Sequence, residues 1–287
     1  MRFQAPSRAE VPAARFDHPV FSGFAPRLHL LRGDAWPGLS TLNAALGGRA
    51  HPITGRPLRF VAQSPALMAD GSHYEARIWE TGQIATREEN WHDLFNALMW
   101  LDRTALKGAV NAAYSAELKR SLPDRRTRPQ AALTHFDEAG ALVLVRDQEV
   151  LRAWDRHAWA SLLLEEAQRW LSGAQVVLFG HALLEHALLP TLWPVAKCLV
   201  VAVPQAMDNT AAAAAAARAI ASGELLRDPQ ELRPLPLAGL PGWHPQASTR
   251  RFFEETPCFR QLRPGRRYPP PWDPAPGACS LPAGFVT

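Results

Sequence analysis

The sequence lacks several features that would identify a class of protein at once. It has three cysteines in 287 residues, and none of them forms a CxxC pair. A disulfide framework or a structural zinc site of four cysteines is therefore excluded, and we expect a reducing, cytoplasmic setting. No apolar run approaches the roughly 18 residues of a membrane span. The first twenty residues contain no apolar core, so we expect neither a secretory signal nor a membrane partner.

The usual catalytic and nucleotide-binding motifs are also missing. The sequence contains no GxGxxG, no Walker loop and no GxSxG, which are the motifs of dinucleotide, nucleotide and serine-hydrolase sites. No serine or cysteine has a visible general-base partner. Function must therefore be sought in clusters of polar residues rather than in a known motif.

Lysine is scarce, although the chain is basic overall. The formal charge is +4 and the isoelectric point about 9.3, yet only Lys107, Lys119 and Lys197 are lysines. The basic residues concentrate in two loop-like segments, Lys119–Pro129 and Arg263–Pro270. Such segments bind nucleic acid in some proteins and are solvated linkers in others, so both interpretations stay open.

Hydrophobic patterning predicts one mixed α/β or α+β domain. We expect an N-terminal arm over residues 1–27, a single globular domain over 28–262 and a proline-rich, extended or disordered tail over 263–287. Strand patterns are expected at 57–63 and at His73–Gly82, and a hairpin at Ala131–Val145. The order strand, helix, strand from Gln175 to Val203 suggests a βαβ unit, so we expect a mixed sheet with packed helices.

Helical periodicity extends from Trp91 to Leu118, with a kink expected near 102–104. Further helices are expected at 148–154, 157–171 and 181–190, and an alanine-driven helix at Asn209–Gly223. A shorter helix is expected within Trp36–Gly47, with Gly47 as its stop signal.

The first candidate cluster is the segment ENWHDLFNALMW, Glu89–Trp100. At about 100° per residue, His92, Asn96, Arg103 and Lys107 form one stripe on a helix. Helix N-termini and basic side chains favour anions, so this stripe predicts binding of a phosphate or carboxylate. His92 would be an acid/base group or a metal ligand.

Helix capping explains part of this polarity without any function. Asn90 is a good N-cap, and an acid three residues later, Asp93, is typical of a capping box. Capping does not explain His92 or Asn96.

The second candidate cluster is FGHALLEH, Phe179–His186, where a buried strand ends and a helix begins. Ligands of open α/β sheets gather outside the carboxyl ends of strands, and His181 lies at such an end. Glu185 follows four residues later on the same helix face, where an ordinary intrahelical hydrogen bond is the alternative interpretation. The spacing matches neither HExxH nor HxxEH.

Two weaker groups complete the candidates. Glu75 and Arg77 would share one face of the strand expected at His73–Gly82, where substrate binding and a solvated face are both reasonable. Asp137 and Glu138 are expected to begin a hairpin turn, where Asp serves local hydrogen bonding.

Five blocks in this order resemble one family: YEARIWETG, the T-R-x-x-NWHDLFNALMWL block, ALTHFDEAG, FGHALLE and GLPGWHP. Together they are similar to the bacterial family catalogued as domain of unknown function 3025, over most of Trp36–Arg260. The resemblance implies a single domain and a bacterial, cytosolic setting. It implies no mechanism and no site residues.

A second similarity covers only Asn96 to Gly108. The run Asn-Ala-Leu-Met-Trp-Leu followed by Lys107-Gly108 is similar to the second half of HNH nucleases. The sequence lacks the Asp-His-x-x-Pro of that family, and Thr104 and Ala105 stand where its last ligand is expected.

Two main hypotheses follow. The first is a hydrolase for an anionic or phosphate-bearing substrate, with catalytic residues His92, His181 and Glu185, and a divalent metal as one candidate cofactor. Its substrate-binding residues would be Asn96, Arg103, Lys107, Glu75 and Arg77. The second is a non-catalytic module that binds nucleic acid or protein through the basic segments; a divergent HNH-like nuclease is the third. The first hypothesis requires His92 and His181 to lie within roughly 12 Å.

Overall fold

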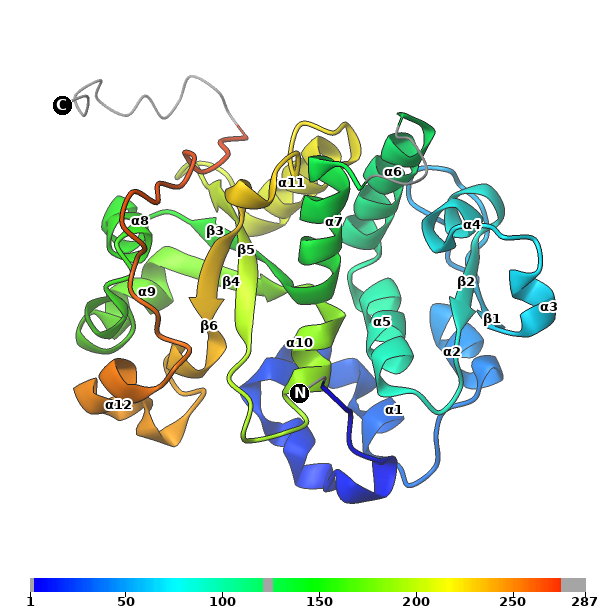
Figure 1. The fold of residues 1–287 in the computed structure, drawn as a ribbon, viewed down its shortest axis with the longest axis horizontal. Coiled ribbons are helices and arrows are strands. Elements are labelled where there is room, and N and C mark those ends of the chain that lie inside the picture. Colours follow the sequence, from blue (N-terminus) through cyan, green and yellow to red (C-terminus); the bar gives the residue numbers. More distant parts are fainter. Residues whose placement is uncertain (1–2, 121–125, 275–287) are drawn as a thin grey trace.

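The computed structural model describes residues 3–120 and 126–274, and its larger sheet is mixed (Figure 1). The strand order is β4–β3–β5–β6, in which β3 is antiparallel to β4 and parallel to β5, and β5 is antiparallel to β6. The strands are β3 (Gly140–Val145), β4 (Ala174–Leu178), β5 (Val195–Ala202) and β6 (Arg233–Pro236). The mixed sheet with packed helices that the sequence predicted is therefore confirmed.

Strand β3 lies inside the sheet, and every one of its residues is buried. Because side chains alternate along a strand, Leu142 and Leu144 face one core, whereas Ala141, Val143 and Val145 face another. A strand buried on both faces needs helices on both sides.

Helices cover both faces of this sheet (Figure 1). The face of Leu142 and Leu144 packs against α6 (Thr104–Arg120), α7 (Arg128–Ala139) and α11 (Asn209–Ala221). The opposite core contains α5 (Trp91–Asp102), α8 (Gln148–Asp155), the π-helix η4 (Ser161–Glu165), α9 (Ala167–Gly173), α10 (His181–His186) and α12 (Arg250–Glu255).

A second, two-stranded sheet lies at the other end of the molecule, beside α4 (Figure 1). Strands β1 (Arg59–Ala62) and β2 (Gln83–Thr86) are parallel and are connected through α3 (Pro65–Met68) and α4 (Tyr74–Thr81). This is the parallel strand–helix–strand unit of the fold. Helix α2 (Leu39–Leu46) packs on β1 and ends at Gly47, which has the left-handed φ of 62° that a helix stop requires.

Residues 3–32 pack against the domain through short helical turns. These are η1 (Arg8–Glu10), η2 (Ala13–Asp17), η3 (Pro19–Arg27) and α1 (Leu28–Arg32). Phe16, Phe21 and Phe24 are at most 2% exposed, and the indole of Trp91 donates a hydrogen bond to the Pro6 carbonyl at 3.0 Å. The arm therefore contributes side chains to the main core.

The chain after β6 returns along the sheet. It passes through η6 (Leu237–Gly239), η7 (Pro245–Ser248) and α12, while η5 (Pro229–Glu231) precedes β6. Trp272 then pairs with β5, because its N–H donates to the Val200 carbonyl and its carbonyl accepts from the Ala202 N–H. The described part of the expected tail is thus extended and held at a sheet edge, and residues 275–287 lie outside the described residues.

Two predicted elements were wrong. His73–Gly82 is not a strand: Tyr74–Thr81 forms helix α4, whose first turn is capped by the His73 ring and whose end is the left-handed Gly82. Ala131–Val145 is not a hairpin: its first half belongs to α7, and β3 begins at Gly140.

The physical reason is the same in both cases. A run of eight to twelve residues with charged groups on several positions fits a two-residue period and a helical period almost equally well. The capping box of α7, formed by Thr127 and Gln130, lies in the segment interpreted as a linker.

The remaining elements largely confirm the sequence patterns. The helix from Trp91 breaks where expected, between α5 and α6, at Arg103. The alanine helix is confirmed, although Asp208 and not Asn209 or Thr210 is its N-cap. The strand–helix–strand order at Gln175–Val203 is present, but β4 and β5 run in opposite directions on either side of β3. Within the described residues no helix is long and apolar enough to cross a membrane.

Candidate functional site

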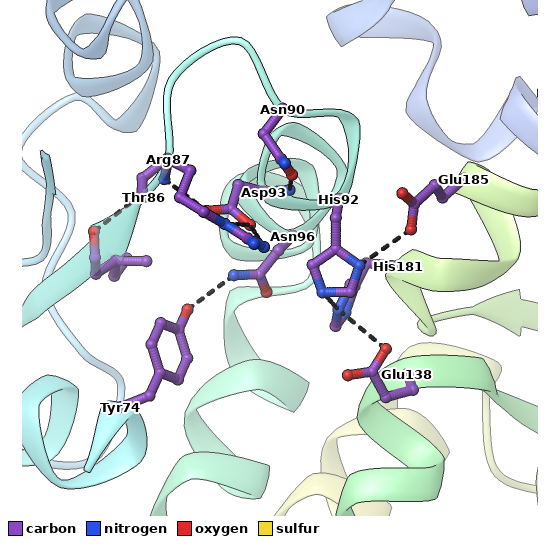
Figure 2. Close-up of polar contacts among 11 residues, drawn as sticks. Tyr74, Thr86, Arg87, Asn90, His92, Asp93, Asn96, Glu138, His181 and Glu185 are labelled. Carbon is purple, nitrogen blue, oxygen red and sulfur yellow. Dashed lines mark hydrogen bonds and ion pairs between the residues drawn. The ribbon is translucent and has the colours of Figure 1, made fainter. Parts of the chain in front are cut away.

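Two imidazoles from distant parts of the chain meet between α5 and α10. The Nε2 atoms of His92 and His181 are 3.0 Å apart, and their rings meet nearly perpendicularly, with centroids 4.4 Å apart. Figure 2 shows both side chains in the space between α5 and the ends of α7 and α10. The convergence that the hydrolase hypothesis required is thus present, as direct contact.

Carboxylates surround this pair. Glu185 Oε2 lies 3.0 Å from His92 Nδ1, so Glu185 contacts the imidazole of another helix rather than His181 on its own helix. Glu138 Oε2 lies 3.5 Å from His181 Nε2, and Asp137 Oδ2 lies 3.8 Å from His181 Nδ1. Donor atoms of His92, Glu138 and His181 all lie within 4.8 Å of one another (Figure 2).

Two glycines bring Glu138 and His181 together. The Gly180 N–H donates to the Gly140 carbonyl at 2.7 Å, which fastens the start of α10 to the end of α7. A Cβ on Gly180 would lie 2.4 Å from the Gly140 nitrogen, a distance that real side chains do not show. The close backbone contact therefore requires glycine at position 180, and it places residues 138 and 181 on adjoining helix ends.

A pocket of about 280 Å³ opens over this cluster, between α7 and the β2–α4 part of the molecule. Its wall includes Tyr74, Glu75 and Asn96, and its rim carries Arg87 and Arg126. Asn96 donates from Nδ2 to the Tyr74 hydroxyl at 2.7 Å, whereas its buried Oδ1 has no hydrogen-bond partner among the described residues. Asn96 is therefore held against Tyr74 at the pocket wall, with a buried acceptor that the described residues leave unpaired.

The start of α5 fulfils its capping prediction only in part. Asn90 is the N-cap and accepts from the Asp93 N–H at 3.1 Å. Asp93 does not return the bond: its carboxylate accepts from the backbone and side chain of Arg87, the latter at 2.7 Å (Figure 2). Asp93 therefore fixes Arg87 at the pocket.

The two imidazoles differ in their affinity for a proton. Burial lowers the pKa of His181 to about 3, in spite of the nearby Asp137 carboxylate. Burial also opposes a charge on His92, but the hydrogen bond with Glu185 and the charges of Glu138 and Glu185 outweigh it and raise the pKa of His92. His181 is therefore neutral at physiological pH.

The carboxyl groups of the site also differ in the direction of their pKa shifts. Burial raises the pKa of Glu138 and raises the pKa of Glu75 to about 7. Burial would also raise the pKa of Asp137, but the Lys107 ammonium, 2.7 Å from Asp137 Oδ1, lowers it. Asp137 is thus an ion-paired carboxylate beside His181.

Cations do not balance the charge at the centre of the site. Lys107 is paired with Asp137, and Arg87 with Asp93. Glu138 and Glu185, in contrast, form no ion pair with an arginine or lysine of the described residues. Their partners among the described residues are the imidazoles of His92 and His181, of which His92 has the raised pKa.

Several residues that the sequence suggested for substrate binding lie elsewhere. Arg103 is outside the pocket: it contacts the Gly23 and Leu178 carbonyls and stacks on Phe24. The break between α5 and α6 changes the helical phase at Arg103, so a stripe drawn through one continuous helix does not hold there. Lys107 lies beneath the pocket and is 3% exposed.

The assumed strand also misplaced Arg77. On a strand, Glu75 and Arg77 would share a face, but on α4 they are about 200° apart. Glu75 lines the pocket and accepts from the Asn111 amide at 2.6 Å. Arg77 instead points to Asp70 and the Leu67 carbonyl, outside the pocket.

Sequence reasoning missed the importance of Glu138, Asp137 and Arg87. The signal for the first two was the helical spacing of Ala132, Leu133 and Phe136, all buried, which places Asp137 and Glu138 on the next positions of the same helix. Arg87 stands in the T-R-x-x-N block, but nothing in a single sequence tells that it pairs with Asp93.

The HNH similarity assumed a strand pair directly before Asn96. In the structure the two strands before α5, β1 and β2, are parallel and are separated by α3 and α4. Asn96 lies in the middle of α5, where it contacts Tyr74.

A family model described as "Protein of unknown function (DUF3025)" matches residues 58–263. The match covers most of the chain, so the protein belongs to this family, and the cluster of His92, Glu138 and His181 lies inside the matched region. No curated protein and no solved structure matches the chain.

Proposed function

We propose that this member of the DUF3025 family is a hydrolase, and that the pocket above His92 and His181 is its active site. The substrate is a small molecule with an anionic group such as a phosphate ester. The observation that supports this proposal most is the 3.0 Å contact between two imidazoles from different helices at a pocket of about 280 Å³.

The reacting point is where Nε2 of both imidazoles and the Glu138 carboxylate meet. A water molecule beside Glu138 can give a proton to the carboxylate and bond to the ester phosphorus, while the bond to the alcohol breaks and the His92 imidazolium gives that alcohol its proton. Imidazole and carboxylate groups of shifted pKa are the usual acid and base in such reactions. Glu185 acts on His92 alone: its contact with Nδ1 fixes the orientation of the ring.

The Arg87 and Arg126 side chains at the rim support an anionic substrate. Arginine binds phosphate and carboxylate oxygens in two-point contacts. These residues take the role that the sequence had suggested for Arg103 and Arg77.

Hydrolysis of a matched set of p-nitrophenyl esters tests the proposal. We expect turnover of a phosphate monoester or diester above that of the acetate ester, and loss of at least about 100-fold in kcat/KM in Glu138→Gln and His92→Asn. Arg126→Gln should raise KM for the phosphate esters only, whereas Arg251→Gln on the exposed face of α12 should change nothing. Equal background rates in wild type and in both pocket variants, for every ester, would refute this function.

The binding-module hypothesis retains one supporting observation. Arg263 and Arg267 are exposed on the described part of the C-terminal basic segment, and exposed arginines are the electrostatic basis of nucleic-acid binding. Retention on heparin that weakens steeply with salt, and that Arg263→Gln with Arg267→Gln abolishes, would favour this second function.

A cytoplasmic location stays a prediction. It is supported by Cys198 and Cys258, which are buried free thiols. Buried unpaired cysteines suit a reducing compartment.

A further inference from the structure

We propose that His92, His181 and Glu138 bind one divalent transition-metal ion, Zn²⁺ by preference, with a fourth position open to the pocket. Metal binding itself does not depend on the proposed hydrolase activity. Only the role of the ion, activation of the attacking water, rests on that function.

The spacing of the donor atoms fits such an ion. Zinc bonds of about 2.0–2.2 Å in a tetrahedron separate neighbouring ligand atoms by about 3.3–3.5 Å. The two Nε2 atoms are 3.0 Å apart, and Glu138 Oε2 is 3.5 Å from that of His181. The donor atoms of all three residues lie within 4.8 Å of one another, so rotation of the side chains can bring them to one ion.

The far nitrogens of both imidazoles face carboxylates, as those of metal-bound histidines do. Glu185 Oε2 is 3.0 Å from Nδ1 of His92, and Asp137 Oδ2 is 3.8 Å from Nδ1 of His181. At His92 the Glu185 carboxylate holds the proton on Nδ1, so Nε2 presents its lone pair to the ion. At His181 the Asp137 carboxylate lies on the same side of the ring but beyond hydrogen-bond distance.

His181 supplies an independent sign of a missing partner. Its side chain is 4% exposed, and its Nδ1 has no hydrogen bond among the described residues. Burial of an imidazole with an unsatisfied nitrogen costs about 1–3 kcal/mol. A bound ion would fix the tautomer with the proton on Nδ1, and a small shift of the ring would bring that proton within hydrogen-bond distance of Asp137.

The charge of the site also suits a cation. Glu138 and Glu185 have only imidazole partners among the described residues, so a divalent ion between the imidazoles offsets the charge of both carboxylates. With the ion bound, the pocket becomes suitable for an anionic substrate, which the two carboxylates would otherwise repel.

The ligand types select the ion. Two imidazoles and one carboxylate suit zinc and its neighbours in the first transition row, whereas magnesium and calcium prefer oxygen ligands only. Three protein ligands and one open position are typical of catalytic zinc, which lowers the pKa of a bound water to about 7. The open position lies in the pocket that Asn96 and Tyr74 line.

Calorimetric titration of chelator-treated full-length protein with Zn²⁺ tests the site directly. We expect one ion per chain with a dissociation constant below about 1 μM, and weakening of at least about 100-fold in His181→Ala and Glu138→Gln. Glu185→Gln, which removes an orienting carboxylate, should weaken binding by about 10–100-fold. Co²⁺ in place of Zn²⁺ should give the visible absorption of a four-coordinate ion.

His135→Ala is the matched control, because His135 lies on α7 like Glu138 but does not line the pocket; it should bind zinc as the wild type does. Glu138→Gln keeps the test valid if His181→Ala fails to fold, since the Glu138 side chain is 43% exposed. Stoichiometry below about 0.1, or binding that neither Glu138→Gln nor His181→Ala weakens, overturns the proposal.

The two proposals fail in different ways. Zinc bound at this site without hydrolysis of any ester supports the metal site and contradicts the hydrolase. Hydrolysis that persists in metal-free protein and is lost in His92→Asn supports the hydrolase and overturns the role of the ion in activating the water, whereas the titration alone decides whether the site binds zinc.

Discussion

Two regions of this molecule bury histidine and charged side chains, and they do so differently. Beneath the C-terminal segment, His157 uses both ring nitrogens, on the Arg260 carbonyl and the Tyr268 hydroxyl, and Arg233 binds Asp155 and the Pro269 carbonyl. At the pocket, a buried polar atom of His181 and one of Asn96 have no hydrogen-bond partner among the described residues. The first region is complete in itself, whereas the second requires something from outside the chain.

This difference separates polar groups that hold the fold from polar groups that are available for chemistry. A satisfied buried network contributes to stability, because removal of one member leaves another uncompensated. An incomplete network lowers stability. A protein keeps such a network only where function requires it. Substitutions in the C-terminal region should therefore mainly lower stability, whereas substitutions at the pocket should mainly weaken ligand binding.

The largest effect on stability is expected for Arg233→Met. The Arg233 side chain is 2% exposed and holds Asp155 at 2.6 Å and the C-terminal segment through Pro269. Loss of this partner should lower the free energy of unfolding by about 3–5 kcal/mol, measured by urea denaturation. Arg251→Met, at a position 81% exposed, is the control and should stay within about 0.5 kcal/mol. A similar small change in Arg233→Met would mean that the C-terminal region is not the stabilising one.

Glu75→Gln should change how stability depends on pH. Burial raises the pKa of Glu75 from 4.5 to about 7, so the folded chain keeps this proton between about pH 4.5 and 7 while the unfolded chain loses it. Wild-type stability therefore falls as pH rises through that window, by roughly 3 kcal/mol. The variant lacks this loss and should be the more stable protein at pH 8 but not at pH 4.5.

The pKa of His181, lowered to about 3, acts in the opposite direction. The unfolded chain takes up a proton on this imidazole below about pH 6.5 and the folded chain does not, so stability rises with pH from about 3 to 6.5. Wild type and Glu75→Gln both contain His181, so this contribution cancels in the difference between their free energies of unfolding. Parallel stability curves for the two proteins from pH 4.5 to 8 would contradict the raised pKa of Glu75.

Gly180→Ala should affect both folding and the site. A Cβ at this position meets the backbone of Ala139 and Gly140 at 2.5 Å or less, so α10 must move away from α7. We expect a loss of about 1–3 kcal/mol and weaker zinc binding, because Glu138 and His181 separate. Gly38→Ala, where a Cβ meets nothing within 4 Å, is the control. Unchanged zinc affinity in Gly180→Ala would show that the glycine contact does not set the site.

The sequence predicted one half of this site and missed the other, for a physical reason. Long amphipathic periodicity fixes the phase of α5, and Asn90 fixes its start, so the position of His92 follows from the amino-acid pattern alone. His181 could be placed because it follows a buried strand. Glu138 could not, since its short helix was ambiguous with a strand and its own position depends on the contact between Gly140 and Gly180.

The same limits explain the misplaced arginines. A helical stripe is reliable only while the helix is continuous, and Arg103 lies at the break. The faces of a short element are reliable only when its type is known, and Arg77 was assigned to a strand that is a helix. Pairing across the fold, such as that of Arg87 with Asp93 or Glu185 with His92, leaves no periodic signal in a single sequence.

The smallest effect on stability is expected for Glu138→Gln in metal-free protein. Neutralising this carboxylate relieves repulsion from Asp137 and Glu185, and its side chain is 43% exposed, so the free energy of unfolding should change by less than about 1 kcal/mol, toward greater stability. Glu254→Gln on the exposed side of α12 gives the baseline in the same urea titration. A loss above about 2 kcal/mol would place Glu138 with Arg233 among the residues that hold the fold. Small change in stability together with lost zinc binding is the combination that only a residue kept for function should give.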